Sequence, residues 1–193
     1  MSVLSVLPRP IVAAPMAGGP STPALAAAVS AAGGLGFLAA GMISADRLAA
    51  DVAEVRTRTD RPFGVNIFLP DPNGHAVDEA AVRAYAERLA PEARRHGVTL
   101  GEPVGGDDAY PEKLAALLAD PVPVVSFVFG LPDRAAVAAC GSGAPRSGPR
   151  VTSPDAPRRR SDSAVDAVVV QGTEAGGHRG GLPDDDDYGV LPL

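Results

Sequence analysis

Short apolar runs alternate with longer stretches of helical character along most of this 193-residue chain. Four of the runs are expected to be buried strands: residues 10–14, 35–39, 63–68 and 123–129. Five intervening stretches are expected to be helices: residues 24–32, 44–58, 78–95, 110–119 and 133–139. Alternation of this kind is typical of parallel βα units, in which helices cover the sheet. The sequence therefore predicts an α/β fold.

Composition narrows the class of protein and the kind of partner. Hydrophobic residues make up 46% of the chain, which is enough for a globular core and argues against general disorder. The formal net charge is −6, and the sole basic cluster is the arginine run at residues 158–160. A nucleic-acid partner is not expected from such a charge balance.

A single cysteine, Cys140, excludes an internal disulfide framework and fits a reducing compartment. An incidental thiol is a better interpretation of Cys140 than a nucleophile, because no activating neighbour is evident in the sequence. Neither a membrane span of about 20 apolar residues nor a signal peptide is recognisable. We therefore expect a cytoplasmic protein without membrane partners.

Residues 140–163 break the strand–helix pattern. This stretch is rich in Gly, Pro, Arg and Ser and shows neither a strand-like apolar run nor an apolar helix face. It is either a long surface loop or, since structureless loops of this length are uncommon within domains, a segment recoded by local frame shifts. Resequencing of the gene distinguishes these two interpretations.

The run Gln-Gly-Thr-Glu-Ala-Gly-Gly-His-Arg-Gly at residues 171–180 carries the strongest functional signal. It follows the apolar run at residues 167–170, and α/β folds bind ligands at the carboxyl ends of their strands. Gly176 and Gly177 allow close approach of the backbone to a ligand, and His178 is suited to proton transfer near neutral pH. These features predict an active-site loop.

Three further strand ends carry related signals: Ala-Pro-Met-Ala-Gly at 14–18, Gly-Val-Asn at 64–66 and Ser-Phe-Val-Phe-Gly at 126–130. In a parallel barrel all of these ends lie on one face. Simpler roles also exist, because Met16 could fill a core gap, Asn66 could cap its own loop and His178 could be a solvated loop residue.

Other polar residues have weaker claims to function. Glu174 could act as an acid or base, or could order its loop. His75 and His96 are expected at the surface. The acidic run at residues 184–187 is expected to be solvated rather than a metal site, and no metal ligands are assigned.

In order and placement, these strand-end motifs closely resemble those of the nitronate monooxygenase family, formerly called 2-nitropropane dioxygenases. The resemblance covers residues 8–139 and 164–193. It implies an FMN-dependent TIM (β/α)8-type barrel, here an incomplete one formed by residues 1–193. Strands one to four and six are recognisable, strand five is degraded, and strands seven and eight are missing.

The resemblance also implies roles for individual residues. Asn66 and Gln171 match positions whose amides bind the polar edge of the flavin. Met16 and its neighbours Ala14 and Pro15 would form the floor beneath the flavin ring, and Gly176 and Gly177 would admit its ribityl phosphate arm. His178 matches the catalytic histidine.

The implied reaction is the oxidation of alkyl nitronates or nitroalkanes by O2, which yields a carbonyl compound and nitrite. One alternative is an FMN-dependent enoyl-thioester reductase, whose family shares the Pro-Met-Ala-Gly and Gly-Gly-His patterns. The other is an inactive truncated remnant, because the last two family strands supply the loops that clamp the FMN phosphate. The oligomeric state stays open.

Overall fold

The structure is a computed structural model that describes residues 7–70, 78–102, 106–130, 132–140, 150–151 and 167–178. Its helices are α1 (Pro23–Ala31), α2 (Ala45–Arg58), α3 (Glu79–Arg95), α4 (Tyr110–Ala119) and α5 (Arg134–Cys140). Its strands are β1 (Gly36–Ala39), β2 (Phe63–Phe68), β3 (Val124–Val128), β4 (Arg150–Val151) and β5 (Val169–Val170), and a 3-10 turn spans Thr173–Ala175. The predicted α/β class is confirmed.

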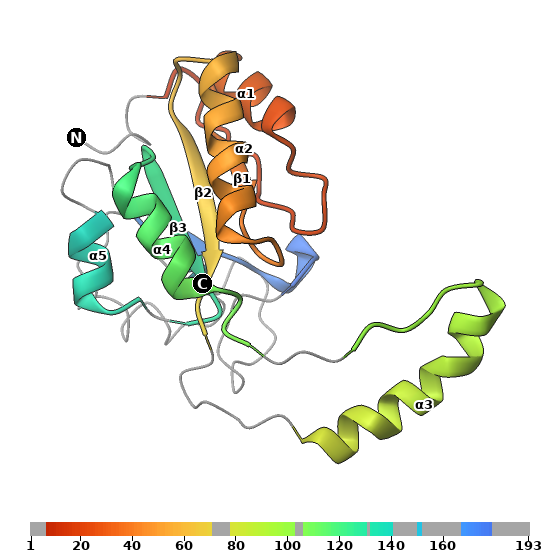
Figure 1. The fold of residues 1–193 in the computed structure, drawn as a ribbon. Coiled ribbons are helices and arrows are strands. Elements are labelled where there is room, and N and C mark those ends of the chain that lie inside the picture. The colour runs from red at the N-terminus through yellow and green to blue at the C-terminus, as the bar shows by residue number, and fades with distance from the viewer. Residues whose placement is uncertain are drawn as a thin grey trace.

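Strands β1, β2 and β3 form a parallel sheet in that order (Figure 1). The expected first strand is shorter than predicted, since residues 10–14 form one parallel bridge, between Val12 and Leu35. Hydrogen bonds Ala13 N–H to Leu35 O and Leu35 N–H to Ile11 O flank it. Pro15 lacks the N–H group that would extend this ladder in one direction, and in the other the Ile11 N–H donates to the Arg9 carbonyl oxygen at 2.8 Å instead.

Helix α2 packs on both α1 and α4, and α4 packs on α5. One face of the sheet is covered by α1, α2 and α4 (Figure 1). Alternate strand residues point into this layer and are almost fully buried: Leu38, Val65, Ile67, Val125 and Phe127. On α2, the apolar side chains at spacings of three and four residues form one stripe that is buried against them: Leu48, Val52 and Val55.

The opposite face of the sheet is organised in layers by the register of the strands. Phe37, Gly64 and Val124 are neighbours across the three strands, and Gly64 leaves room for the Phe37 ring. One pleat nearer the carboxyl ends, Ala39, Asn66 and Ser126 form the next layer. Layers of alternating residues are how the interior of a (β/α)8 barrel is filled. The described strands are therefore an open part of such a barrel.

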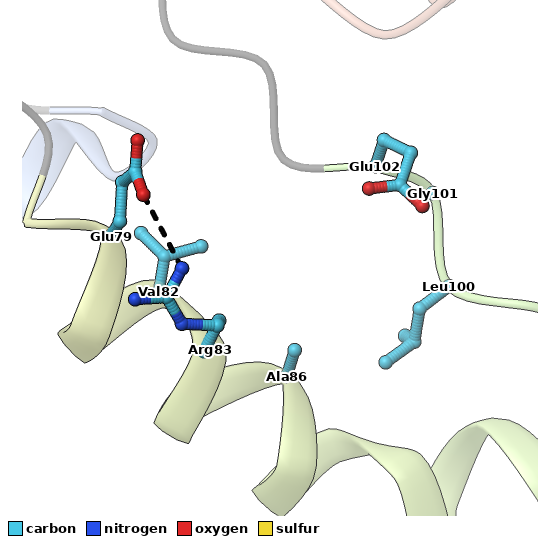
Figure 2. Close-up of a pocket in the computed structure, with 7 residues that line it drawn as sticks. All are labelled: Glu79, Val82, Arg83, Ala86, Leu100, Gly101 and Glu102. Atoms are coloured by element: carbon cyan, nitrogen blue, oxygen red, sulfur yellow. Dashed lines mark hydrogen bonds and ion pairs between the residues drawn. The ribbon is translucent and has the colours of Figure 1, made fainter.

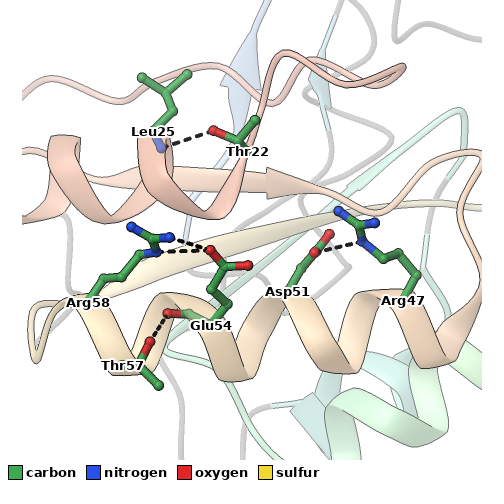
Figure 3. Close-up of polar contacts among 7 residues, drawn as sticks. All are labelled: Thr22, Leu25, Arg47, Asp51, Glu54, Thr57 and Arg58. Atoms are coloured by element: carbon green, nitrogen blue, oxygen red, sulfur yellow. Dashed lines mark hydrogen bonds and ion pairs between the residues drawn. The ribbon is translucent and has the colours of Figure 1, made fainter.

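Side chains at the helix ends and surfaces stabilise the helical layer (Figure 3). The Leu25 N–H donates to Thr22 Oγ1 at 3.2 Å, which caps α1. On the exposed side of α2, Arg47 pairs with Asp51 at 2.8 Å and Arg58 with Glu54 at 2.6 Å, both across one helical turn. These exposed pairs contribute little individually.

Helix α3 stands away from the sheet and from the other helices (Figure 1). Its chain leaves the body after β2 and returns before α4, and Ala93 is its buried side chain. No helix among the described residues is both long and apolar enough to cross a bilayer.

The prediction of an irregular segment at residues 140–163 is wrong at two places. Cys140 is the last residue of α5, and Arg150–Val151 forms β4, which pairs in parallel with β5. Backbone hydrogen bonding needs no apolar run, so Arg150 enters a strand that its composition does not predict. The other residues of this segment lie outside the described part, as do residues 179–193.

Gly36 is expected to be indispensable for the contact between β1 and α1. A Cβ atom at this position would lie 2.0 Å from the carbonyl oxygen of Ala26, so Gly36→Ala forces α1 away from the sheet. We expect a loss of about 3 kcal/mol in the free energy of unfolding, measured by urea denaturation. Gly101→Ala, where a Cβ meets open space, is the control. Equal stability of the two variants would contradict this packing.

Candidate active site at the carboxyl ends of the strands

Asn66 and Ser126 form a buried polar pair in the last complete layer of the sheet interior. Asn66 is 4% exposed and Ser126 is 6% exposed. The Asn66 Nδ2 group donates to Ser126 Oγ at 2.8 Å and to the Ser126 carbonyl oxygen at 3.3 Å. These bonds join β2 to β3 and differ from the alternative in which Asn66 caps its own loop. The pair places an amide and a hydroxyl on an otherwise apolar inner face.

Gln171 folds the loop that follows β5. It is 7% exposed, and its Nε2 group donates to the carbonyl oxygens of Gly176 at 3.3 Å and His178 at 3.1 Å. Within the loop, the Ala175 N–H donates to the Gly172 carbonyl oxygen at 3.2 Å, which closes the 3-10 turn. One buried amide therefore holds both the glycine pair and the backbone of the candidate base.

Gly176 and Gly177 have φ angles of +68° and +70°, which residues other than glycine rarely adopt. A Cβ atom added at either position would meet nothing within 4 Å. Glycine is thus required here by the path of the backbone rather than by crowding. The open space beside these two residues is consistent with the approach of a ligand, which the sequence predicts.

His178 is exposed, and its ring meets that of Phe129 beyond the end of β3. The two ring centroids are 6.0 Å apart with an interplanar angle of 74°. Phe129 in turn contacts Phe68, the last residue of β2, at 4.8 Å and 71°. The sheet and the loop after β5, which are far apart in sequence, therefore meet at the carboxyl ends of the strands.

The segment at residues 14–16 lies at the exposed end of the Val12 bridge. Ala14 is exposed, Pro15 is half-buried, and Met16 is 43% exposed, so Met16 does not fill a core gap. The Met16 N–H donates to Ser21 Oγ at 2.8 Å, and the Ser21 N–H donates to the Met16 carbonyl oxygen at 3.4 Å. These contacts close a local turn that leaves the Met16 side chain accessible.

A buried ion pair joins α4 to the chain segment that precedes it. Lys113 of α4 is 1% exposed, and its Nζ lies 2.7 Å from Asp108 Oδ2. The other carboxylate oxygen, Asp108 Oδ1, accepts from the Met42 N–H at 2.8 Å. Met42, Asp108 and Ala109 all have positive φ. The pair thus connects the loop after β1 to the chain that returns from α3.

Cys140 and Tyr110 are both half-buried at the contact between α4 and α5. Burial raises the pKa of the Cys140 thiol, which disfavours the nucleophilic thiolate. Burial, followed by the charges of Asp133 and Cys140, raises the pKa of the Tyr110 hydroxyl. These directions support the interpretation of Cys140 as an unreactive thiol, although it lies in a helix rather than in a loop.

The remaining candidates lie at the surface or outside the described residues. His96 is exposed, as the sequence predicts, and its Nε2 lies 3.1 Å from the Glu92 carboxylate. Glu174 is exposed in the 3-10 turn. His75 and the acidic run at 184–187 lie outside the described part, within which no cluster of metal-ligating side chains occurs.

A hollow of about 460 Å³ lies between α3 and residues 100–102 (Figure 2). Figure 2 shows Val82 and Ala86 on the helix facing Leu100, with the Glu79–Arg83 ion pair at one end. None of the predicted site residues lines it. We therefore place the candidate site at the strand ends and not in this hollow.

Sequence reasoning missed three partners in this region. Ser126 and Phe129 stand in a recognised strand-end motif, but their pairing with Asn66 and His178 depends on strand register and loop path. Lys113 could have been noticed, because it occupies the same helix face as the apolar Leu117. A lysine on an apolar face indicates either an ion pair or a site.

Replacement of Asp108 by Asn should cost about 3–5 kcal/mol in the free energy of unfolding, because it leaves the buried Lys113 ammonium without its counter-ion. Asn still offers an acceptor to the Met42 N–H. The double variant Asp108→Asn, Lys113→Met should recover much of the loss. Glu79→Gln, which breaks an exposed pair, should cost less than about 1 kcal/mol in the same urea titration. A loss no larger at Asp108 than at Glu79 would contradict a stabilising role.

Gln171→Glu should open the loop at residues 172–178, because a carboxylate would face two carbonyl oxygens that now accept hydrogen bonds. The local cost is about 1–3 kcal/mol, measured as faster amide hydrogen exchange in this loop. Gln171→Met, which removes the donors without adding repulsion, should have a smaller effect. Exchange unchanged in Gln171→Glu would show that the amide does not hold the loop.

Comparison with known proteins connects this geometry to one family. A sequence model described as nitronate monooxygenase matches residues 2–193. The chain is 40% identical over 194 residues to a nitronate monooxygenase of Paraburkholderia phytofirmans, covering 96% of this chain and 52% of that protein. It is 42% identical over 178 residues to a nitronate monooxygenase of Pseudomonas aeruginosa, covering 89% and 49%.

Solved structures agree in fold. A nitroalkane oxidase from Streptomyces ansochromogenes superimposes with a TM-score of 0.85 at 48% identity, covering 95% of this chain and 52% of that one. FabK from Thermotoga maritima superimposes less well, with a TM-score of 0.65 at 30% identity, covering 93% and 45%. The chain thus spans about half the length of the proteins it matches. On the match across residues 2–193, the chain belongs to the nitronate monooxygenase family.

Proposed function

We propose that this protein is an FMN-dependent oxidoreductase that oxidises alkyl nitronates or nitroalkanes with O2 to a carbonyl compound and nitrite. The observation that carries the proposal is the folded loop after β5. Gln171 binds the backbone of His178, and the His178 ring lies against the end of β3. In a chain of this family, that arrangement would present His178 as a base at the carboxyl ends of the strands.

The donor set at the strand ends fits the polar edge of a flavin ring. Such an edge has both donors and acceptors, and a neutral amide carries both. The NH2 groups of Asn66 and Gln171 each donate twice within the protein, so a flavin would either bind the amide oxygens or replace one of these internal bonds. The two amides are buried, and because they are uncharged, no charge has to be neutralised when a ring covers them. When bound, FMN would supply a ring that takes electrons from the substrate and passes them to O2.

Other residues would complete the FMN site. Ala14, Pro15 and Met16 would lie beneath the ring, in keeping with the accessible Met16 side chain. Gly176 and Gly177 would admit the ribityl phosphate arm through the open space beside them. Removal of water around the bound substrate would strengthen each polar contact in this region.

His178 would act on the substrate proton. A neutral nitroalkane must lose the proton from the carbon that bears the nitro group, and an imidazole is well suited to accept it near neutral pH. A nitronate has already lost this proton, so His178 would only orient it. The two substrates therefore make different demands on the same side chain.

The substrates we propose are small molecules, with no nucleic acid or membrane partner. The lone Cys140 and the absence of charge complementary to nucleic acid support this assignment and a cytoplasmic location.

The direct test is an absorbance spectrum after incubation with FMN and desalting, followed by O2 uptake with propionate 3-nitronate. Flavin absorbance retained with the protein, together with O2 consumption and nitrite release, is the expected result. Turnover of an enoyl-thioester with a nicotinamide cofactor, without turnover of the nitronate, would instead identify the reductase. Failure to retain FMN or to react with either substrate would point to an inactive remnant.

His178→Asn should lower kcat/KM for a neutral nitroalkane by about 10²–10⁴-fold, the usual contribution of a general base. Turnover of the nitronate should fall much less, because no proton has to be removed. His96→Asn, at the exposed C-cap position after α3, is the matched control and should leave both rates unchanged. Equal losses on both substrates in His178→Asn would contradict the role as a base.

A further inference from the structure

Phe129 has a backbone conformation that an aromatic residue rarely adopts. Its φ is +69°, in the left-handed region where the Cβ atom crowds the backbone. It comes immediately after β3 and before Gly130. Such strain persists only where the surrounding structure holds it, and it is concentrated at functional sites.

The neighbouring strand holds this turn in place. The Leu69 N–H donates to the Val128 carbonyl oxygen at 3.0 Å, which extends the β2–β3 ladder to the start of the turn. Gly130 passes close to Leu69, since an added Cβ would lie 3.3 Å from that side chain. The path of the backbone directs the Phe129 ring to a position between two other rings.

Aromatic contacts then run across the carboxyl ends of successive strands. The Phe68 ring lies over Gly41 after β1, where an added Cβ would be 2.2 Å from its Cζ atom. Phe68 meets Phe129 edge to face at 4.8 Å, and Phe129 meets His178 edge to face at 6.0 Å. Contacts of this geometry favour one relative orientation of the two rings.

We propose that Phe129 is a positioning residue that sets the orientation of the His178 imidazole, and that Gly41 and Phe68 fix Phe129 in turn. The backbone of His178 is held by Gln171, whereas its ring is directed by Phe129. The contribution to the reaction rests on the proposed function, because it requires His178 to be the base. The ring contact itself does not.

The test separates the ring from the backbone. Phe129→Gly removes the ring and adopts φ +69° without strain, so the turn keeps its path. Phe129→Tyr keeps the ring. In the purified protein the proton resonances of the His178 ring are followed by NMR. The chain has three histidines, so the signal that disappears in His178→Asn is assigned directly.

In Phe129→Gly, the His178 resonances should shift as the ring current of Phe129 is lost. The value of kcat/KM for the neutral nitroalkane should fall by about 10–100-fold, as expected for a misplaced base. Nitronate turnover should fall much less, and FMN binding should stay near its original value. Phe129→Tyr should retain the neutral nitroalkane activity. Unchanged His178 resonances together with an unchanged nitroalkane rate in Phe129→Gly would overturn the proposal.

A second variant covers the case in which Phe129→Gly does not fold. Gly41→Ala displaces Phe68 and should shift the His178 resonances with Phe129 still present, whereas Gly101→Ala should not. Identical His178 spectra in Gly41→Ala and the original protein would also overturn the proposal that Gly41 and Phe68 fix Phe129. If the original protein oxidises neither substrate, the proposed function fails, and the comparison of Gly41→Ala with Gly101→Ala still decides whether the packing of Phe68 and Phe129 sets the position of the His178 ring.

Discussion

The register between β1, β2 and β3 is the constraint on which the rest of the structure depends. It brings Ala39, Asn66 and Ser126 into one row. The residue before each of them on its strand points into the helical layer instead. A slip of one residue would turn Asn66 into the helical layer and leave its amide without Ser126. Gly36 and Gly64 support this register from opposite faces, one against the backbone of α1 and the other beneath the Phe37 ring.

The sequence predicted the regular elements well because their signals are local. The strand at 63–68 and the helix at 110–119 have the predicted bounds, since apolar runs and a helix-terminating Asp-Pro pair mark them. The short bridge at Val12 and the strand at Arg150–Val151 were predicted less well. Both depend on hydrogen bonds to a distant strand, which composition does not encode.

The sequence named candidate site residues but did not predict the contacts among them. Motif spacing indicated Asn66, Gln171 and His178, and the structure shows what each amide binds. The donor groups that order the loop were hidden, because one Gln171 side chain bonds to carbonyl groups five and seven residues away. The positive φ of Phe129 was equally hidden, since phenylalanine gives no sequence signal for a left-handed turn.

Two kinds of contact thus act on the candidate base, one on its main chain and one on its ring. A buried amide holds the main chain, and an aromatic edge directs the imidazole. Because the ring contact comes from the end of β3, the orientation of the His178 ring is defined only when the loop after β5 lies against the sheet. The chemistry proposed for His178 is in this sense a property of tertiary packing.

The Asp108–Lys113 pair has a consequence for how this fold can vary. It attaches the chain that follows α3 to helix α4. The Asp108 carboxylate also accepts from the Met42 N–H in the loop after β1. The helix beyond this closure adds little to the core. Changes in the sequence of α3 should therefore have little effect on the parallel sheet. This helix is a suitable place in the fold for sequence variation and for grafting new recognition elements.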